Sequence, residues 1–326
     1  MNPLVSIIIP CYNTEAFIED AIKSAINQTY KNIEIIIVDD ASTDKSLEII
    51  SSIKDSRIRF IHLDTNKGIA NARNVGLDNA KGDYICWLDS DDMYHSSFIE
   101  LLLTYATQYN LDFVECQFSR QIENMAIIPD EAVYISDACD FCKRYSTRQL
   151  QTSLWSKLFR KELFDNYRFP VGKIYEENYF YFDCWERFTK CGYIESQLYF
   201  YRPREKSIMN SMGKSQLEQD IFVQKYMFHH SEHMPFAVEI RKRIVLNCIT
   251  LYIKYVASAK FDYHGILSIA DCLDSCLEDN TLGASVATEL TPKKRLIFNQ
   301  RRSYLLAKSL NIYHLTRNRL KAVLRK

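Results

Sequence analysis

The sequence lacks the glycine-rich loops with which many nucleotide-binding enzymes hold phosphate groups. Only eight of its 326 residues are glycine, and it contains neither a Gly-x-Gly-x-x-Gly motif nor a complete P-loop motif, Gly-x-x-x-x-Gly-Lys-Ser/Thr. These absences argue against a dinucleotide-dependent dehydrogenase and against a P-loop enzyme. If the chain binds a diphosphate, another group must neutralise it, and a metal ion held by carboxylates is the natural substitute.

Signals for export, membrane insertion and nucleic-acid binding are also missing. No basic segment precedes the first apolar run, and no apolar run approaches the roughly 20 residues needed to cross a bilayer. The 41 Lys and Arg residues balance 41 Asp and Glu residues, so the net charge predicts no nucleic-acid partner. We therefore expect a cytoplasmic protein that is at most peripheral to a membrane.

The ten cysteines lie mostly in apolar stretches, which is typical of buried thiols in a reducing compartment. Cys139 and Cys142 have CxxC spacing, but no second pair follows at zinc-ribbon distance. We therefore do not expect a metal or redox role for this pair.

Strand-like and helix-like segments alternate through the first third of the chain. Apolar runs of strand length alternate with segments of helical periodicity, which predicts βαβ units and a parallel sheet. The expected strands are 5–9, 33–38, 58–62 and 84–88, and the expected helices are 15–27, one capped near 43–44, and 68–80. Right-handed crossovers place the loops after these strands at one rim of the sheet.

Polar residues follow each of these four strands. The four clusters are Pro10–Asn13, Asp39–Asp44, Asn66–Gly68 (with Arg73 and Asn74 close behind) and Asp89–Asp92. Together they define a crevice that is the default ligand site of an open α/β sheet.

The most informative cluster is Asp89-Ser90-Asp91-Asp92, directly after the apolar run 84–88. Like charges this close repel, and burying them is costly unless a cation or hydrogen-bond donors compensate. A strand that ends in Asp-x-Asp is therefore a good place to hold Mn²⁺ or Mg²⁺. An acidic turn that only caps the next helix is the alternative.

Five motifs, in this order, resemble those of family 2 glycosyltransferases with the GT-A fold. They are Val-Ser-Ile-Ile-Ile-Pro-Cys-Tyr-Asn (5–13), Gln-Thr-Tyr (28–30), Ile-Ile-Val-Asp-Asp-Ala-Ser-Thr-Asp (36–44), Asn-Lys-Gly-Ile-Ala-Asn-Ala-Arg-Asn-Val-Gly (66–76) and Leu-Asp-Ser-Asp-Asp (88–92). The resemblance continues through 155–160, 169–170, 175–177 and 199–202 to 207–210. It implies a doubly wound, mostly parallel sheet flanked by helices. It also implies transfer of a sugar from a nucleotide diphosphate, usually UDP, with inversion at the anomeric carbon.

The resemblance assigns most strand-end residues to the nucleotide-sugar donor. The residues expected to bind the donor are Pro10, Tyr12, Asn13, Asp40, Asn66, Arg73, Asp89, Ser90 and Arg202. Asp40 is expected to accept a hydrogen bond from the uracil ring, and Arg73 to lie on the base or the phosphate. The expected metal ligands are Asp91, Asp89 and Asp92.

Inverting transfer also needs a general base on the sugar face opposite the diphosphate, so the second half of the chain should supply it. In the family the base is usually the Asp of a Glu-Asp pair before a helix, and here that position reads Glu176-Glu177. Glu177 matches the aspartate and is our candidate base, with Glu176 and Asp183 as alternatives. Glutamates that only stabilise a helix N-terminus are the structural alternative.

Three regions follow from these patterns: a nucleotide-sugar-binding half, 1–110, an acceptor-binding half, 111–215, and a helical region, 216–326. Residues 291–326 contain eleven Lys and Arg and no Asp or Glu, interleaved with apolar residues. Such a segment is typical of a helix that binds a membrane surface or a partner. We expect 293–326 to bring the enzyme near a saccharide or lipid-linked acceptor at the inner membrane face. A solvated helix packed on the acidic remainder is the alternative.

Two other functions remain open. A sugar nucleotidyltransferase would need a glycine-rich basic loop after the first strand, where this chain has Pro10-Cys11-Tyr12-Asn13. A degenerate transferase-like subunit that binds a partner would explain the altered Glu176-Glu177 pair, but not the intact Asp-x-Asp motif.

Overall fold

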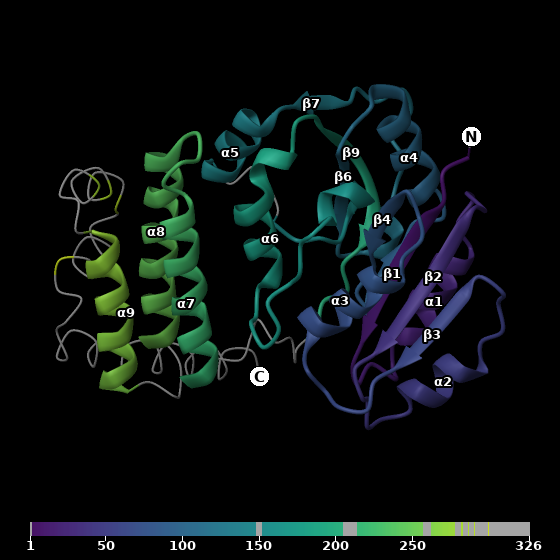
Figure 1. The fold of residues 1–326 in the computed structure, drawn as a ribbon, viewed down its shortest axis with the longest axis horizontal. Helices are drawn as coiled ribbons and strands as arrows, with labels where there is room; N and C mark the ends of the chain where they lie inside the picture. The colour runs from purple at the N-terminus through teal and green to yellow at the C-terminus, as the bar shows by residue number, and fades with distance from the viewer. Residues whose placement is uncertain are drawn as a thin grey trace, which may run out of the picture. The chain divides into compact units, whose positions relative to one another are not determined.

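The computed structural model describes residues 2–147, 152–204, 214–256 and 262–277, together with the single positions 282, 286, 290 and 299. The chain divides into two compact units, Met1–Phe141 with Gln151–Arg204, and Cys142–Leu150 with Glu205–Lys326. Figure 1 shows that the first is an α/β unit, coloured purple to teal, and that the second contains the green and yellow helices.

Four parallel strands form one half of the sheet in the first unit. They are β1 (Val5–Cys11), β2 (Ile33–Asp39), β3 (Ile58–His62) and β4 (Tyr84–Trp87), in the order β3-β2-β1-β4. The intervening helices are α1 (Ile18–Ile26), α2 (Ser46–Ser52) and α3 (Ile69–Asn79). The predicted βαβ pattern is confirmed. Helix α1 begins later than predicted, because the Thr14 carbonyl first accepts turn hydrogen bonds from Phe17 and Ile18.

The other half of the sheet mixes strand directions. Beyond β4 it continues through β8 (Lys157–Arg160), β6 (Phe113–Ser119), β9 (Cys191–Phe200) and β5 (Met93–Tyr94), and β7 (Tyr134–Ser136) also pairs with β9. Strand β8 is antiparallel to both β4 and β6, whereas β6 and β9 are parallel. The helices of this half are α4 (Phe98–Tyr109), α5 (Ala138–Ser146) and α6 (Glu176–Cys184).

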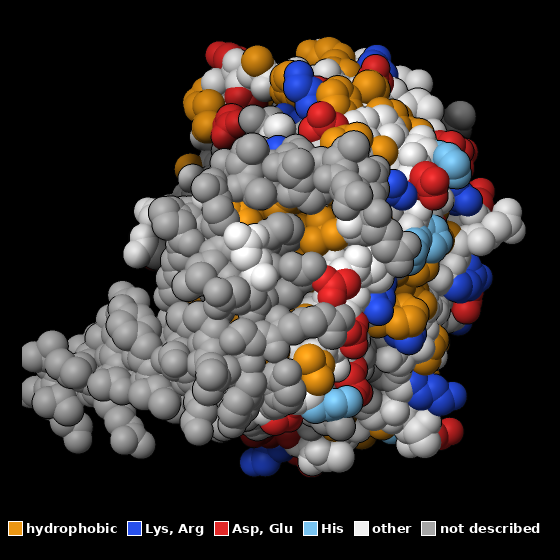
Figure 2. Space-filling view, turned by 90° about the vertical axis from the view of Figure 1, so that its left-hand side faces the viewer, with side chains coloured by type: hydrophobic (Ala, Val, Ile, Leu, Met, Phe, Trp, Pro, Cys, Tyr) orange, Lys and Arg blue, Asp and Glu red, His pale blue; other side chains and the backbone are white. Residues whose placement is uncertain are grey.

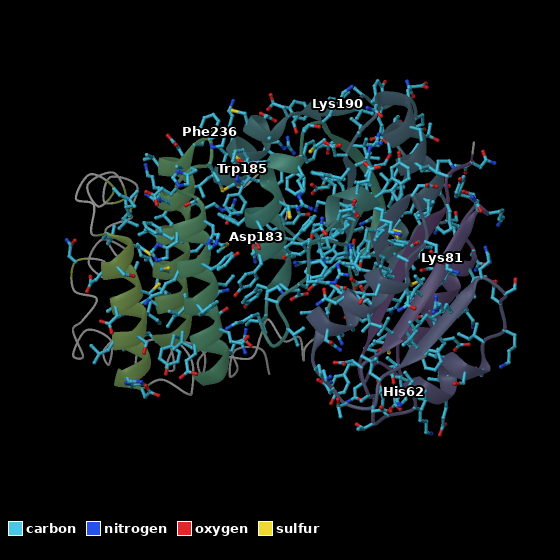
Figure 3. The ribbon with its side chains drawn as sticks, viewed as in Figure 1. His62, Lys81, Asp183, Trp185, Lys190 and Phe236 are labelled. Carbon is cyan, nitrogen blue, oxygen red and sulfur yellow. The ribbon has the colours of Figure 1, made fainter. Side chains whose placement is uncertain are left out.

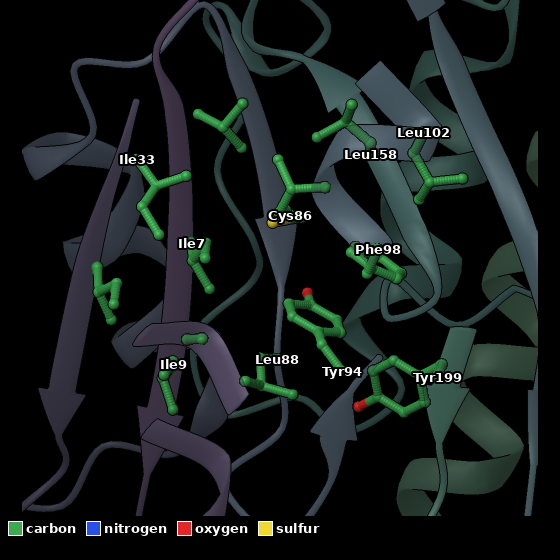
Figure 4. Close-up of a cluster of buried hydrophobic side chains, with 14 of the residues drawn as sticks. Ile7, Ile9, Ile33, Cys86, Leu88, Tyr94, Phe98, Leu102, Leu158 and Tyr199 are labelled. Atoms are coloured by element: carbon green, nitrogen blue, oxygen red, sulfur yellow. The ribbon is translucent and has the colours of Figure 1, made fainter. Parts of the chain in front are cut away.

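Strands β1 and β4 are buried along their whole length, as their continuous apolar sequences require. Figure 4 shows Ile7 and Ile9 of β1, with Cys86 and Leu88 from β4 and its end, in the same cluster as Tyr94 and Phe98. The Tyr94 and Phe98 rings stack with centroids 3.9 Å apart. Each fully buried Ile, Leu or Phe side chain contributes about 1.5–3 kcal/mol relative to exposure. This packing fixes the strand end from which the acidic motif projects.

The described residues of the second unit are helical, as predicted for the region after 216. They form α7 (Lys214–His230), α8 (Ala237–Val256) and α9 (Tyr263–Cys276). The Asp262 side chain caps α9 by accepting a hydrogen bond from the Gly265 amide, 2.7 Å away. Among the described residues, no helix is both long and apolar enough to cross a membrane. The basic segment 291–326 lies outside the described residues, apart from position 299.

The cysteines are all free, and nine of the ten are buried. Burial raises the pKa of the Cys86 thiol to about 12, so this group is an inert apolar side chain. Cys139 is the exposed one, and it lies on α5 one turn before the buried Cys142.

Candidate active site

The loops after β1, β2 and β3 are joined by hydrogen bonds at one rim of the sheet. The Asn13 side-chain oxygen accepts a hydrogen bond from the Thr43 amide, 2.8 Å away. The Asp40 carboxylate accepts from the amides of Lys67 and Gly68, the latter at 2.7 Å. His62, labelled at the end of β3 in Figure 3, lies with Nδ1 2.7 Å from Asp39 Oδ2. These contacts hold the strand-end residues in one group and fix the start of α3.

The predicted donor residues at this rim differ in accessibility. Pro10 and Asp40 are buried, whereas Tyr12 is 47% exposed and Asn66 is also exposed. Within the part of the chain that the structure describes, no hydrogen bond or ion pair joins Tyr12 or Asn66 to the acidic residues. The accessible side chains are therefore free to contact a ligand.

Arg73 brings together carboxylates from both halves of the unit. Its guanidinium, buried on α3, donates a hydrogen bond to Glu176 and lies 3.4 Å from Asp89 and 4.0 Å from Glu177. It also lies over the rings of Trp87 and Phe169. Burial opposes the charged guanidinium, but the neighbouring carboxylates raise the pKa of Arg73 above its ordinary value. The cation is therefore held between the predicted metal site and the predicted base.

The two glutamates at the start of α6 differ in their surroundings. The Glu176 side chain is 4% exposed and ion-paired with Arg73, whereas the Glu177 side chain is 22% exposed. Burial and the nearby Glu176 charge raise the pKa of Glu177 to about 8. Burial also raises the pKa of Glu176, although Arg73 opposes the shift. Glu177 is thus the member of the pair that a substrate can reach.

The three aspartates after β4 have different partners. Both oxygens of Asp92 accept hydrogen bonds, one from the Tyr199 hydroxyl at 2.7 Å and one from the Arg202 amide at 2.8 Å. Asp89 and Asp91 are partly accessible, with side chains 25% and 14% exposed. Burial and repulsion from Asp89 raise the pKa of Asp91 to about 6. Asp89 and Asp91 therefore keep partly accessible oxygens, each with an arginine beside it, next to a third carboxylate whose two oxygens are both hydrogen-bonded.

Two arginines after β9 contact this acidic loop, and only one of them was expected in the site. Arg202 donates to the Asp91 carbonyl oxygen at 2.8 Å and to the Asp20 carboxylate at 3.1 Å, so it ties the loop to α1. Arg204 instead lies with Nε 2.5 Å from the Asp91 carboxylate. Arg204 was not among the predicted site residues, because nothing near it in the sequence shows that β9 ends beside Asp91.

The remaining predicted residues lie beside this cluster, away from it, or outside the described residues. Ser90 is buried next to Asp89. Asp183 is exposed on α6, about two turns beyond the glutamate pair, where Figure 3 labels it. Residues 207–210, which match the last family motif, lie outside the described residues.

Asp89 and Asp91 have the chemistry that suits a divalent cation. Their oxygens are hard ligands, and burial and repulsion from Asp89 raise the pKa of Asp91 although Arg204 opposes the shift. The described residues contain no group of three or more His, Cys, Asp or Glu placed to hold a metal ion by themselves. A bound ion would need further ligands from substrate and water, which is how Mg²⁺ is usually held beside phosphates.

The order and directions of the strands place this protein in the GT-A fold class. A structure of residues 1–349 of Staphylococcus aureus TarS in complex with UDP-GlcNAc matches 95% of this chain and 88% of that chain, with a TM-score of 0.69 and 18% identity. The mannosyltransferase PcManGT of Pyrobaculum calidifontis, in complex with GDP-Man and Mn²⁺, matches 96% of this chain and 88% of its own (TM-score 0.54, 15% identity). At these identities the likeness shows the fold alone.

Sequence comparison shows the family. The sequence pattern of glycosyl transferase family 2 matches residues 6–172, and the chain belongs to this family. The glycosyltransferase GlyA of Streptococcus pneumoniae serotype 4 is 33% identical over 217 residues, 63% of this chain. The Escherichia coli protein named UDP-Glc:alpha-D-GlcNAc-diphosphoundecaprenol beta-1,3-glucosyltransferase WfaP is 57% identical over 91 residues, 28% of this chain. The chain spans 31% of the length of GlyA and 36% of the length of WfaP.

Proposed function

We propose that the protein is a metal-dependent inverting glycosyltransferase that uses a UDP-sugar. It would transfer a hexosyl or N-acetylhexosaminyl residue to a hydroxyl of a saccharide or lipid-linked acceptor, in the synthesis of a surface polysaccharide or glycoconjugate. The observation that carries the proposal is the pairing of a partly accessible Glu177 with a buried Glu176, both beside the Arg73 guanidinium that also contacts Asp89.

Glu177 would act as the general base. In the reaction, the acceptor hydroxyl transfers its proton to a Glu177 oxygen while its own oxygen forms a bond to the anomeric carbon. The bond from that carbon to the diphosphate breaks with its electron pair, and UDP leaves from the opposite face. Positioned bases typically contribute a factor of about 10²–10⁴ to such a step. The raised pKa of Glu177 makes it a stronger base than an exposed glutamate.

Asp89 and Asp91 would hold Mn²⁺ or Mg²⁺ beside the diphosphate. A bound cation supplies positive charge for the leaving group. Arg204, which contacts Asp91, is placed to contribute a further positive charge. The Mn²⁺ in the PcManGT complex and the UDP-GlcNAc in the TarS complex support the choice of cofactor and donor by analogy of fold.

The names of relatives support the choice of acceptor. WfaP is named as acting on a GlcNAc unit carried by diphosphoundecaprenol, which is a lipid-linked saccharide. We extend this acceptor class to the present protein, with a place at the inner face of the plasma membrane. The division into a donor half, 1–110, an acceptor half, 111–215, and a helical region, 216–326, belongs to the same proposal.

The first experiment measures transfer from UDP-Glc, UDP-GlcNAc, UDP-Gal and dTDP-Glc to GlcNAc-diphosphoundecaprenol, with Mn²⁺ or with EDTA. We expect one UDP-sugar to be used, only with metal present, and the product to have the inverted anomeric configuration. Retained transfer in EDTA would contradict the metal assignment. If no donor is used or bound, the glycosyltransferase proposal fails for this chain.

The second experiment tests the base. Glu177→Gln should lower turnover by about 10²–10⁴-fold, because it removes the proton acceptor, while UDP binding measured by calorimetry stays within about threefold. Asp183→Asn, on the exposed part of the same helix, is the matched control and should keep wild-type turnover. Near-normal turnover in Glu177→Gln, or a loss confined to Asp183→Asn, would overturn the assignment.

A further inference from the structure

The side chain of Asn74, next to Arg73 on α3, makes two hydrogen bonds to a segment that is distant in the sequence. Its side-chain nitrogen donates to the Phe169 carbonyl oxygen at 2.8 Å, and its side-chain oxygen accepts from the Phe169 amide at 2.9 Å. An asparagine amide supplies one donor group and one acceptor in a fixed plane, so it can satisfy both main-chain groups of one residue. The contact therefore fixes the position and the orientation of the backbone at Phe169.

The Phe169 side chain is held by packing against other aromatic rings. It is 1% exposed, and its ring packs edge-on against Trp87, with centroids 5.6 Å apart. It also lies 6.2 Å from the ring of Phe180, which belongs to α6. Phe169 is therefore buried between β4 and α6 and hydrogen-bonded to α3.

Only residues 170–175 separate Phe169 from the glutamates that begin α6. This connection contains no helix or strand, and Gly172 and Tyr175 have φ angles of +78° and +55°. A left-handed conformation in a residue such as Tyr175 is uncommon and persists only where its surroundings fix it. The position of the glutamate pair therefore depends on how both ends of the connection are held.

Helix α3 holds both ends of this connection. Asn74 holds Phe169, and Arg73 holds Glu176. The helix itself lies close to β1, because Gly76 has no side chain: a Cβ there would come within 2.4 Å of the Ile8 side chain. One rigid helix thus connects the parallel half of the sheet to the segment that carries Glu177.

We propose that Asn74 is a positioning residue for the transfer reaction: its contact with Phe169 places the Glu177 carboxylate for proton abstraction without touching the substrate. The inference rests on the proposed function of Glu177 as the base. Arg73 fixes the same segment through Glu176. The family resemblance placed Arg73 in the donor site, whereas its contacts here face Glu176 and Asp89.

The test compares Asn74→Ala with Asn79→Ala. Asn79 is a matched control because it lies on the same helix and, among the described residues, its side chain bonds within that helix, to the Val75 carbonyl at 2.8 Å. Asn74→Ala should lower kcat about 10- to 100-fold, since a displacement of about 1 Å at a reacting group can cost that much. The KM for the UDP-sugar should change less than threefold, because the donor rim is untouched.

A double variant separates positioning from general loss of structure. Because Asn74 acts through Glu177, Glu177→Gln/Asn74→Ala should be no slower per folded molecule than Glu177→Gln alone. If Asn74→Ala does not fold, Asn74→Asp retains the acceptor for the Phe169 amide and should show a smaller loss of kcat. Unchanged kcat in Asn74→Ala, or fully additive losses in the double variant, would overturn the inference. A wild-type protein that is inactive with every donor would instead refute the proposed function.

Discussion

At the scale of single residues, the same side-chain type performs different tasks because its surroundings differ. Glu176 and Glu177 are neighbours in sequence, yet one is enclosed by an ion pair with Arg73 and the other is open to a ligand. Asp91 and Asp92 also differ, since Tyr199 and Arg202 donate hydrogen bonds to Asp92, whereas Asp91 pairs with Arg204. These four residues were among the predicted site residues, but their pairings were not predicted. The pairings depend on side chains that lie more than 100 positions away in the sequence.

The raised pKa of Glu177 predicts a pH-dependent loss of stability. Its pKa is about 8 in the folded protein against an ordinary value of 4.5, so ionisation is less favourable in the folded state than in the unfolded state. Wild-type stability should therefore fall relative to Glu177→Gln as the pH rises from about 4.5 to about 8. Thermal unfolding at pH 5, 6.5 and 8, without metal or nucleotide, measures this difference.

The exposed Glu186 provides the control for this measurement. The difference in Tm between Glu186→Gln and wild type should stay constant over the same pH range. A Tm difference for Glu177→Gln that does not grow with pH would show that the carboxylate is not held in an environment that disfavours its charge.

At the scale of elements, the sequence predicted the parallel half of the sheet well and the rest poorly. Strand β3 was predicted with the bounds that the structure shows, because its apolar pattern is local. Strand β8 was not predicted, since it is only four residues long and is defined by pairing with β4 and β6, more than 40 positions earlier. Strand β7 is three residues long and forms only against β9. Such pairings depend on tertiary context rather than on intrinsic preference.

Gln28 connects several elements through its side chain, and its contribution to the free energy of unfolding can be tested. It is fully buried, and its side chain bonds to the carbonyls of Ser24 and His95 and to the amide of Ile99. Because it joins α1 to α4 and to the segment after the acidic motif, Gln28→Ala would leave buried polar groups unsatisfied. We expect a loss of about 1–3 kcal/mol in the free energy of unfolding.

Gln108→Ala, at an exposed position on α4, is the matched control and should change stability by less than about 0.5 kcal/mol. Denaturant titration of both variants gives the comparison. If Gln28→Ala and Gln108→Ala have the same free energy of unfolding, water replaces the hydrogen bonds of Gln28 without loss of stability.

At the scale of the whole molecule, the charge is unevenly distributed along the chain. All the formal charges of residues 291–326 are positive, eleven in number, so the first 290 residues carry 30 Lys and Arg against 41 Asp and Glu. Figure 2 shows acidic and basic side chains interspersed on one described face. The concentrated positive charge is therefore a property of the C-terminal segment, and we propose that it attracts anionic lipid.

Vesicle binding tests this proposal on the chain of 326 residues. Replacing Lys293, Lys294, Arg295, Arg301 and Arg302 by Gln should weaken binding to phosphatidylglycerol vesicles by at least tenfold, since each basic residue near such a surface contributes about 1 kcal/mol. Binding of the wild type should also fall as salt rises. Neutral phosphatidylcholine vesicles are the control. Equal binding by wild type and variant would remove the membrane role of this segment.

Because nine of the ten cysteines are buried, a thiol-reactive label can be attached to the native protein at one position. A maleimide dye or spin label, applied to the native protein for a short time, should react at Cys139 alone and leave the other thiols unmodified. That attachment point lies on α5, whose first residues belong to one compact unit and whose last residues belong to the other. The natural sequence therefore already provides a single-site probe, with no cysteine to remove, for following changes at the helix that both units share.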